Sequence, residues 1–182
     1  MAISWCVTVS NCSEFLLTRR SIRVFEEKEV PMDVVLRAID IARYAPSAKN
    51  IQPWTFIIVK ERDILDKLAK LHPGAAPLRR APIAIVVLAD SQASPISYLV
   101  DGANAVIYLW LALHCLGLGA VWIQTLRNID EIRKLLNIPD NWVPVAILAI
   151  GYPAEKPSPK PRKDLSEIVF INTFGNRYSD IQ

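Results

Sequence analysis

An uncharged stretch from Ala105 to Ile123 restricts the fold of this chain more than any other feature. A helix that is apolar on every side must be covered on every side, by protein or by lipid. The stretch is long enough to cross a membrane, but the sequence Gly117-Leu118-Gly119 divides it. We therefore predict a buried helix over 101–116 and a strand over 120–124, with a membrane span as the alternative.

The composition is that of one folded domain. The chain has 182 residues, of which 52% are hydrophobic and 21% are charged. This balance excludes a disordered chain, and the length predicts a single domain over 1–182. A domain of this size buries roughly 70% of its unfolded surface. Covering an entirely apolar helix is difficult within so small a domain, so we expect a second subunit to cover part of it.

Charge and residue types exclude several kinds of function. The formal net charge of +3 comes without a long basic run, which argues against a nucleic-acid partner. The three cysteines form no CxxC pair and the two histidines are far apart, so neither a disulfide framework nor a metal site is predicted. Residues 1–10 lack a positively charged start, so we expect no signal peptide and a cytoplasmic protein. Residues 1–12 are expected to form either an ordered strand or a loose tail.

Hydrophobic periodicity predicts alternating helices and strands along the rest of the chain. Continuous apolar runs, which are typical of strands covered on both faces, occur at 82–89 and 142–150. The alternation also permits a doubly wound sheet, although no GxGxxG fingerprint follows a strand. The remaining predicted elements are a short helix around 15–17, helices at 31–45, 61–71 and 128–136, and strands at 54–60 and 168–171.

A polar loop over 46–52 joins the first long helix to the first long strand. Prolines at both ends hold its backbone extended. Between them, Ser47, Asn50 and Gln52 can each donate and accept hydrogen bonds. A planar heterocycle with imide and carbonyl edges needs such a loop, although a simple polar turn carries the same residue types.

Two basic segments lie far apart in the sequence. Arg19, Arg20, Ser21 and Arg23 offer several cationic donors and a hydroxyl, which suit a phosphate group of charge about −2. Residues 154–163 alternate prolines with lysines and arginines, which predicts an extended, polyproline-like arm that crosses a surface. A solvated surface would explain either segment taken alone.

These segments, in this order, resemble the nitroreductase family of FMN-dependent oxidoreductases. The resemblance implies an α+β fold, with a central mixed sheet wrapped by helices, and an intertwined homodimer. In such a dimer the 154–182 segment reaches the partner subunit, and each of two FMN sites is built from both subunits. The matching segments are RRSIRVF at 19–25, ARYAPSAKNIQPWTFIIV at 42–59, DGANAVIYLWLALHCLGLGAVWI at 101–123, AILAIGYP at 146–153 and PRKDL at 161–165.

The resemblance also implies a role for each site residue. The arginines and the serine of the first basic segment would hold the FMN phosphate and ribityl chain, with Arg23 near the N1/O2 side of the ring. The 46–52 loop of the other subunit would lie against the flavin, and Gln52 would support that loop. The end of the strand at 120–124 would approach the ring near N5, and the arm would return to the phosphate. The implied cofactor-binding residues are Arg19, Arg20, Ser21, Arg23, Pro46, Ser47, Ala48, Asn50, Gln52, Trp122, Ile123, Gln124, Thr125, Arg162 and Lys163.

The implied activity is hydride transfer from NADH or NADPH through flavin N5 to nitroaromatic, quinone or similar acceptors. No side chain must act as an acid or base, because the flavin carries the chemistry. The alternatives are a specialised relative that degrades flavin or removes halogen, and a non-catalytic flavin-binding protein.

Thr125 stands where many family members have glycine, so we expect its side chain to crowd or contact N5. The short segment 90–101 lacks the helix that often covers the substrate, which predicts an open pocket.

Overall fold

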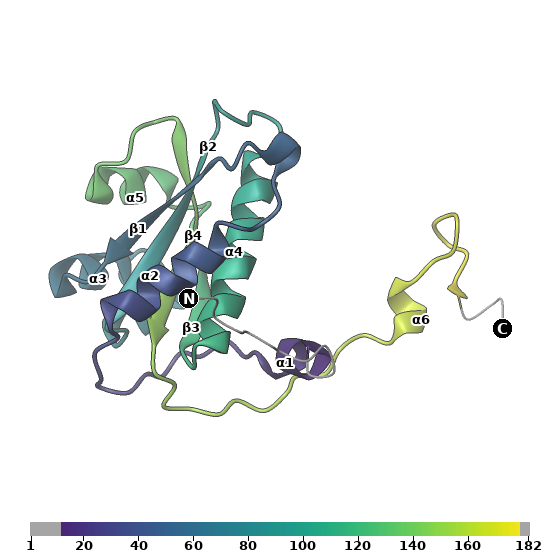
Figure 1. Ribbon diagram of the computed structural model, residues 1–182, viewed down its shortest axis with the longest axis horizontal. Helices are drawn as coiled ribbons and strands as arrows, with labels where there is room; N and C mark the ends of the chain where they lie inside the picture. Colours follow the sequence, from purple (N-terminus) through teal and green to yellow (C-terminus); the bar gives the residue numbers. More distant parts are fainter. Residues whose placement is uncertain (1–11, 179–182) are drawn as a thin grey trace, which may run out of the picture.

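The computed structural model describes residues 12–178, which form a four-stranded sheet wrapped by helices (Figure 1). The sheet has the spatial order β1-β2-β4-β3, and every neighbouring pair of strands is antiparallel. The α+β class predicted from the sequence is confirmed.

The strands are β1 (Trp54–Val59), β2 (Ile83–Asp90), β3 (Gly119–Gln124) and β4 (Trp142–Gly151). The helices are α1 (Cys12–Thr18), α2 (Met32–Ala42), α3 (Arg62–Leu68), α4 (Tyr98–Cys115), α5 (Ile129–Leu136) and α6 (Leu165–Ile168), with 3₁₀ turns η2 (Ala48–Asn50) and η3 (Pro73–Arg79).

A short extended segment over 21–25 continues the sheet beyond β3. Ser21 makes a parallel bridge with Ala120, and the next backbone N–H donates to the Ala120 carbonyl oxygen at 3.0 Å. Phe25 makes an antiparallel bridge with Pro153, just after β4. The bridge at Ser21 is parallel, but it is isolated and lies outside the four strands, which all pair antiparallel. It also fixes the segment that carries Arg23 along the edge strand β3.

The central strands β2 and β4 are buried on both faces, which explains their continuous apolar runs. Side chains of a strand point alternately to opposite faces of the sheet. In β2, Ile85 and Val87 pack in the core that contains α2 and α4, whereas Ala84 and Val86 pack with α3, η3 and α5. β4 alternates between the same two cores. The sheet is therefore the middle layer of a three-layer structure.

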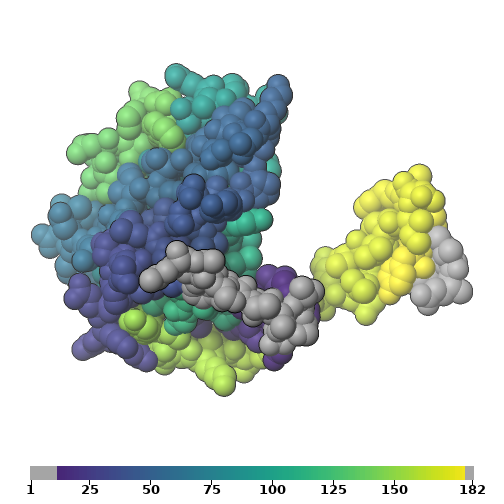
Figure 2. Space-filling model, viewed as in Figure 1, coloured from purple at the N-terminus to yellow at the C-terminus, as the bar shows by residue number. Residues whose placement is uncertain are grey.

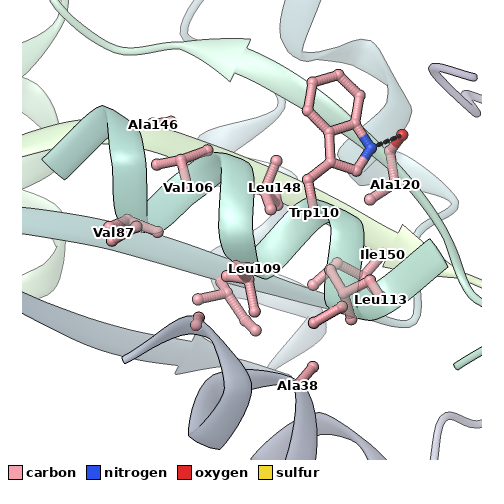
Figure 3. Close-up of a cluster of buried hydrophobic side chains, with 14 of the residues drawn as sticks. Ala38, Val87, Val106, Leu109, Trp110, Leu113, Ala120, Ala146, Leu148 and Ile150 are labelled. Atoms are coloured by element: carbon pink, nitrogen blue, oxygen red, sulfur yellow. Dashed lines mark hydrogen bonds between the residues drawn. The ribbon is translucent and has the colours of Figure 1, made fainter. Parts of the chain in front are cut away.

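Helix α4 is the predicted apolar helix, and it covers one face of the sheet. Its residues Leu109 and Leu113 are fully buried, and the indole N–H of Trp110 donates to the Ala120 carbonyl at 3.1 Å (Figure 3). Among residues 12–178 it is the one helix long and apolar enough to cross a membrane by length and composition, and 44% of it is buried in this subunit. Its outer face leaves Ile107 exposed. The single subunit therefore covers only one side of the helix.

The C-terminal arm, residues 154–178, differs from the prediction. The expected strand at 168–171 is wrong, because α6 occupies its start and Phe170 makes an isolated bridge with Arg177. A capping box stabilises α6: the Asp164 carboxylate accepts from the Ser166 backbone N–H at 2.9 Å, and Glu167 accepts from the Asp164 backbone N–H at 2.9 Å. Figures 1 and 2 show residues 165–178 lying apart from the body of the subunit. The expected tail lies outside the described residues except for Cys12, which begins α1.

Candidate functional site

The fold brings the two basic segments together around one hollow of about 140 Å³. The extended segment after α1 forms one wall, and the C-terminal arm forms the other. We call Arg19, Arg20, Arg23 and Arg162 the arginine cluster. Lys163 is exposed and does not line the hollow. Its predicted contact with the phosphate stays a prediction. The residues of the hollow are Arg19, Arg20, Ser21, Arg23, Pro157, Ser158, Lys160 and Arg162.

Arg19 lies deepest in the arginine cluster. Its guanidinium stacks over the Trp110 ring, 4.1 Å from the ring centroid. Its Nη1 atom is buried and has no hydrogen-bond partner within residues 12–178. Burial lowers the pKa of Arg19, and the charges of Arg20 and Arg162 lower it further. A buried cationic donor among like charges is costly unless an anion satisfies it, so this position fits a phosphate group.

The other members of the arginine cluster are held by local contacts. The Arg20 Nη1 atom donates to the carbonyl oxygens of Leu17 at 2.6 Å and Arg19 at 2.9 Å, where it caps the end of α1. Arg23 is exposed, and within the described residues its side chain makes one hydrogen bond, donated to the Ser21 carbonyl at 3.3 Å. The Glu155 carboxylate accepts from the backbone N–H of Arg23 at 2.5 Å, which ties the arm to this segment.

A larger cleft of about 470 Å³ adjoins this hollow and shares Arg19, Arg20 and Pro157 with it. Its floor is the start of β3, where Gly119 permits close packing of the neighbouring segment. A Cβ atom at Gly119 would lie 2.8 Å from the Ile22 Cβ atom, which is too close for any larger residue without a shift. The cleft therefore depends on this glycine, and it provides an apolar surface beside the cationic one.

The loop over 46–52 has a strained backbone. Lys49, Asn50 and Gln52 have φ angles of 52°, 57° and 52°, in the left-handed region that L-residues avoid. The Gln52 backbone N–H donates to Ser47 Oγ at 2.9 Å, and its side-chain amide donates to Asn50 Oδ1 at 3.0 Å. Such strain persists where the surroundings fix it, commonly at functional sites. The cofactor-binding roles predicted for these residues stay predictions.

Asp101, near the start of α4, holds this loop in place. Its side chain is buried, and Oδ1 accepts from the Ala48 backbone N–H at 3.0 Å. Ser94 Oγ donates to its other oxygen at 3.2 Å. Asn104, one turn later, donates to the Pro46 carbonyl at 3.1 Å. These contacts fix the loop to the N-terminal end of α4.

Within one subunit, the loop and the arginine cluster lie at opposite ends of α4. The loop is bound at Asp101, whereas the cleft beside the cluster is lined by Trp110 and His114. At 1.5 Å per residue, the helix separates positions 101 and 114 by roughly 20 Å. A single subunit therefore does not bring the two predicted halves of the site together.

The end of β3 differs from what its sequence suggested. Thr125 is fully buried, and its hydroxyl donates to the Pro144 carbonyl at 2.6 Å. The expectation that this side chain would crowd or contact the ring is therefore wrong, because it points into the protein. The Gln124 side-chain oxygen accepts from the backbone N–H groups of Thr125 at 2.7 Å and Leu126 at 2.9 Å. His72 Nε2 lies 2.9 Å from the Gln124 carbonyl oxygen. Trp122 and Ile123 precede these residues in β3, half-buried and buried respectively.

Sequence reasoning did not assign roles to four residues that shape these sites. Asp101 and Glu155 each hold a backbone segment by accepting from its N–H groups. Trp110 and His114 line the cleft, and they occupy positions one helical turn apart on α4. The helical spacing was visible in the sequence, but the partners come from distant segments. Only the folded structure places them together.

His114 connects α1 to α4 beside the arginine cluster. Its ring stacks on Phe15 with centroids 5.0 Å apart, and Nε2 lies 3.1 Å from Thr18 Oγ1. Burial lowers its pKa below the ordinary value of 6.5, and the charge of Arg19 lowers it further; the Phe15 backbone opposes this, and Arg20 adds a still smaller lowering. The folded protein therefore favours the neutral ring. Protonation would add a cation to a region that is already positive.

We predict that acid destabilises the protein partly through His114. Because the folded-state pKa is lower than the unfolded one, the unfolded state binds more protons between the two values, and stability falls as pH decreases through 6.5. Replacing His114 with Gln should reduce the drop in Tm between neutral and mildly acidic pH. The matched control is His72→Gln. An unchanged pH dependence in the His114 variant, measured by thermal unfolding at several pH values, would contradict this assignment.

The comparisons with known proteins point to one family. The nitroreductase family model matches residues 16–76 and 72–152. A Methanothermobacter thermautotrophicus protein, provisionally named NADH dehydrogenase/NAD(P)H nitroreductase, is 38% identical over 85% of this chain and 84% of its own length.

Two solved structures agree with that match. A Parabacteroides distasonis protein with the same provisional name superposes with a TM-score of 0.85 at 33% identity, covering 89% of this chain and 98% of its own. An FMN-dependent nitroreductase from Clostridium difficile superposes with a TM-score of 0.81 at 33% identity, covering 88% and 98%. The family match, the sequence identity and the shared fold lead to one conclusion: this chain belongs to the nitroreductase family.

Proposed function

We propose that the protein is an FMN-dependent oxidoreductase that takes electrons from NADH or NADPH and passes them to nitroaromatic, quinone or similar acceptors. Membership of the family supports the activity, and the C. difficile relative is FMN-dependent by name. The observation that carries the proposal is the arginine cluster, in which a buried guanidinium nitrogen of Arg19 lacks a partner within the described residues. A phosphate of FMN would supply that partner.

The residues of this chain bind and orient FMN, which when bound supplies the redox chemistry. Arg19 and Arg162, which line the same hollow, would neutralise the phosphate, and Ser21 would offer a hydroxyl to it. Arg23 lies further along the extended segment, and its charge would stabilise negative charge on the N1/O2 side of the ring. The backbone at the end of β3 would approach the other edge of the ring. For the N–H groups of Thr125 and Leu126 to reach a ligand, the Gln124 side chain must release them.

We propose that the active form is a homodimer. The outer surface of α4 and its neighbours forms an apolar groove of about 250 Å³. A long helix with one uncovered apolar side costs free energy in water, roughly 25 cal/mol for each Å² left exposed. The second copy would cover this groove and the exposed residues beside it on α4 and α1. The groove residues are Phe15, Ile41, Tyr108, Leu111, Ala112 and Cys115, and the exposed neighbours are Leu16, Leu17, Val100 and Ile107.

The dimer also completes the site in this proposal. The 46–52 loop lies at the opposite end of α4 from the arginine cluster of its own subunit. A two-fold axis across α4 would place the loop of one subunit beside the arginine cluster of the other. The projecting arm supports the same arrangement, because it leaves Leu165, Ile168 and Phe174 exposed in the single subunit. We propose that the arm covers the partner and that the assembled dimer works in the cytoplasm.

Mixing the protein with FMN and then with NADH or NADPH tests the activity. Under anaerobic conditions we expect either nicotinamide to bleach the flavin absorbance, and a quinone or nitroaromatic to restore it. Bound FMN that neither nicotinamide reduces would indicate a non-catalytic flavin-binding protein. Loss of the flavin itself during turnover would indicate the specialised, flavin-degrading type. A soluble dimer that binds no FMN would overturn the proposal.

Replacing Arg19 with Gln tests its contact with the phosphate. Loss of one charge-assisted hydrogen bond, worth about 1.5–3 kcal/mol, should weaken FMN binding by about tenfold or more. Riboflavin, which lacks the phosphate, should bind with little change, as measured by flavin fluorescence quenching. Lys134→Gln, an exposed site on α5, controls for net charge. Equal losses for FMN and riboflavin would show that Arg19 supports the fold instead of binding the phosphate.

Reassembly of mixed dimers tests whether both subunits build each site. Arg19→Glu disables the arginine cluster of one variant, and Ala48→Trp adds bulk to the 46–52 loop of the other without removing a side-chain hydrogen bond. Each homodimer should be inactive. After unfolding and joint refolding, heterodimers carry one intact site, so activity should recover to about a quarter of the wild-type value. Sites built within single subunits would show no recovery.

A further inference from the structure

A second basic pocket, which the arginine cluster does not explain, adjoins it through Arg23. This pocket has a volume of about 400 Å³ and is lined by Arg23, Arg79 and Arg80 together with Pro73, Gly74, Ala76 and Pro77. We call it the guanidinium pocket. Its three charged lining residues are all arginines, and no acidic residue lines it. Arg23 belongs to both hollows, so the two are neighbours along one surface.

The turn that carries Arg79 and Arg80 is rigidly anchored. Ala75 and Leu78, within this turn, and Ala81, just after it, are fully buried. Arg62, on α3, donates to the carbonyl oxygens of Leu78 at 2.5 Å and Ala81 at 3.1 Å. At the other end of the turn, His72 contacts the backbone of β3. Two prolines further restrict its backbone. The arginines therefore project from a fixed scaffold.

The side chains of Arg79 and Arg80 have no hydrogen-bond or ion-pair partner in the described part of the chain. By contrast, Arg43, Arg62 and Arg133 all form ion pairs with neighbouring aspartates. Three guanidinium groups around one hollow repel each other, and a bound anion would relieve that repulsion. Guanidinium groups recognise phosphate in particular, because their N–H groups match its oxygens in pairs.

We infer that the guanidinium pocket binds the 2′-phosphate of NADPH and so makes NADPH the preferred electron donor. This inference rests on the proposed function, which requires a nicotinamide donor near the flavin but leaves open which one. NADPH differs from NADH by a single phosphate monoester, which carries a charge of about −1.5 to −2 at neutral pH. The pocket lies beside Arg23, next to the proposed flavin ring, and it supplies cationic groups matched to that one difference.

The double variant Arg79→Gln/Arg80→Gln tests this inference. We expect kcat/KM for NADPH to fall by about tenfold or more, since two charge-assisted contacts are lost. The value for NADH should change much less. Lys67→Gln/Lys134→Gln removes the same net charge from exposed positions elsewhere and should leave the ratio of the two values unchanged. An unchanged ratio in the arginine variant would overturn the inference.

A binding measurement without turnover separates this inference from the proposed function. Calorimetric titration with adenosine 2′,5′-bisphosphate should show binding to the wild type that weakens by about tenfold in the arginine variant. Adenosine 5′-monophosphate should bind both proteins equally weakly. Equal affinity of both proteins for the bisphosphate, with FMN bound and NADH oxidised, would overturn the inference alone. If the arginine variant lost activity only with negatively charged acceptors, the pocket would belong to the acceptor site. That result would also overturn the inference.

Discussion

Strands β2 and β4 are buried on both faces, and this burial dictates where the helices pack. Each buried leucine or isoleucine contributes roughly 1.5–3 kcal/mol, so both faces of these strands must be covered. Helices α2 and α4 cover one face, and α3, η3 and α5 cover the other. Because α4 is apolar on nearly all sides, packing it on the sheet leaves its outer side uncovered. The need to bury apolar side chains, which packs α4 against the sheet, therefore also favours covering its outer side with a second subunit.

The candidate functional surfaces occur where these packed elements end. The arginine cluster follows α1 and is fixed by the bridge to β3, by Trp110 and by the Glu155 contact with the arm. The strained loop is fixed by Asp101 at the opposite end of α4. In both places, groups that are unfavourable in isolation are held by well-packed neighbours, as expected for preorganised binding sites. The Arg19 guanidinium, with one nitrogen unpartnered within residues 12–178, and the strained loop lower the stability of the protein without a ligand. A ligand that binds them would raise that stability.

Much of the fold could be predicted from local sequence. The two apolar strands, the amphipathic helices and the glycine turn after α4 depend on periodicity and on residues close in sequence. The strand at 168–171 was predicted wrongly, because the Asp164 capping box stabilises a helical turn that occupies the start of that apolar run. Thr125 was also misjudged. Its residue type suggested a side chain at the flavin, but its orientation depends on Pro144, which lies on a different strand.

Local sequence was enough to predict the family and the order of most elements, and it supplied a list of candidate residues for binding a phosphate and a planar ring. These properties follow from ordered motifs and from local chemistry. Only the tertiary structure showed that Arg162 joins Arg19, that Asp101 holds the 46–52 loop, and that Arg79 and Arg80 share a pocket with Arg23. It also showed that the loop and the arginine cluster of one subunit lie apart. Contacts between distant segments depend on how the layers pack, and the length of a helix sets the distance between its two ends.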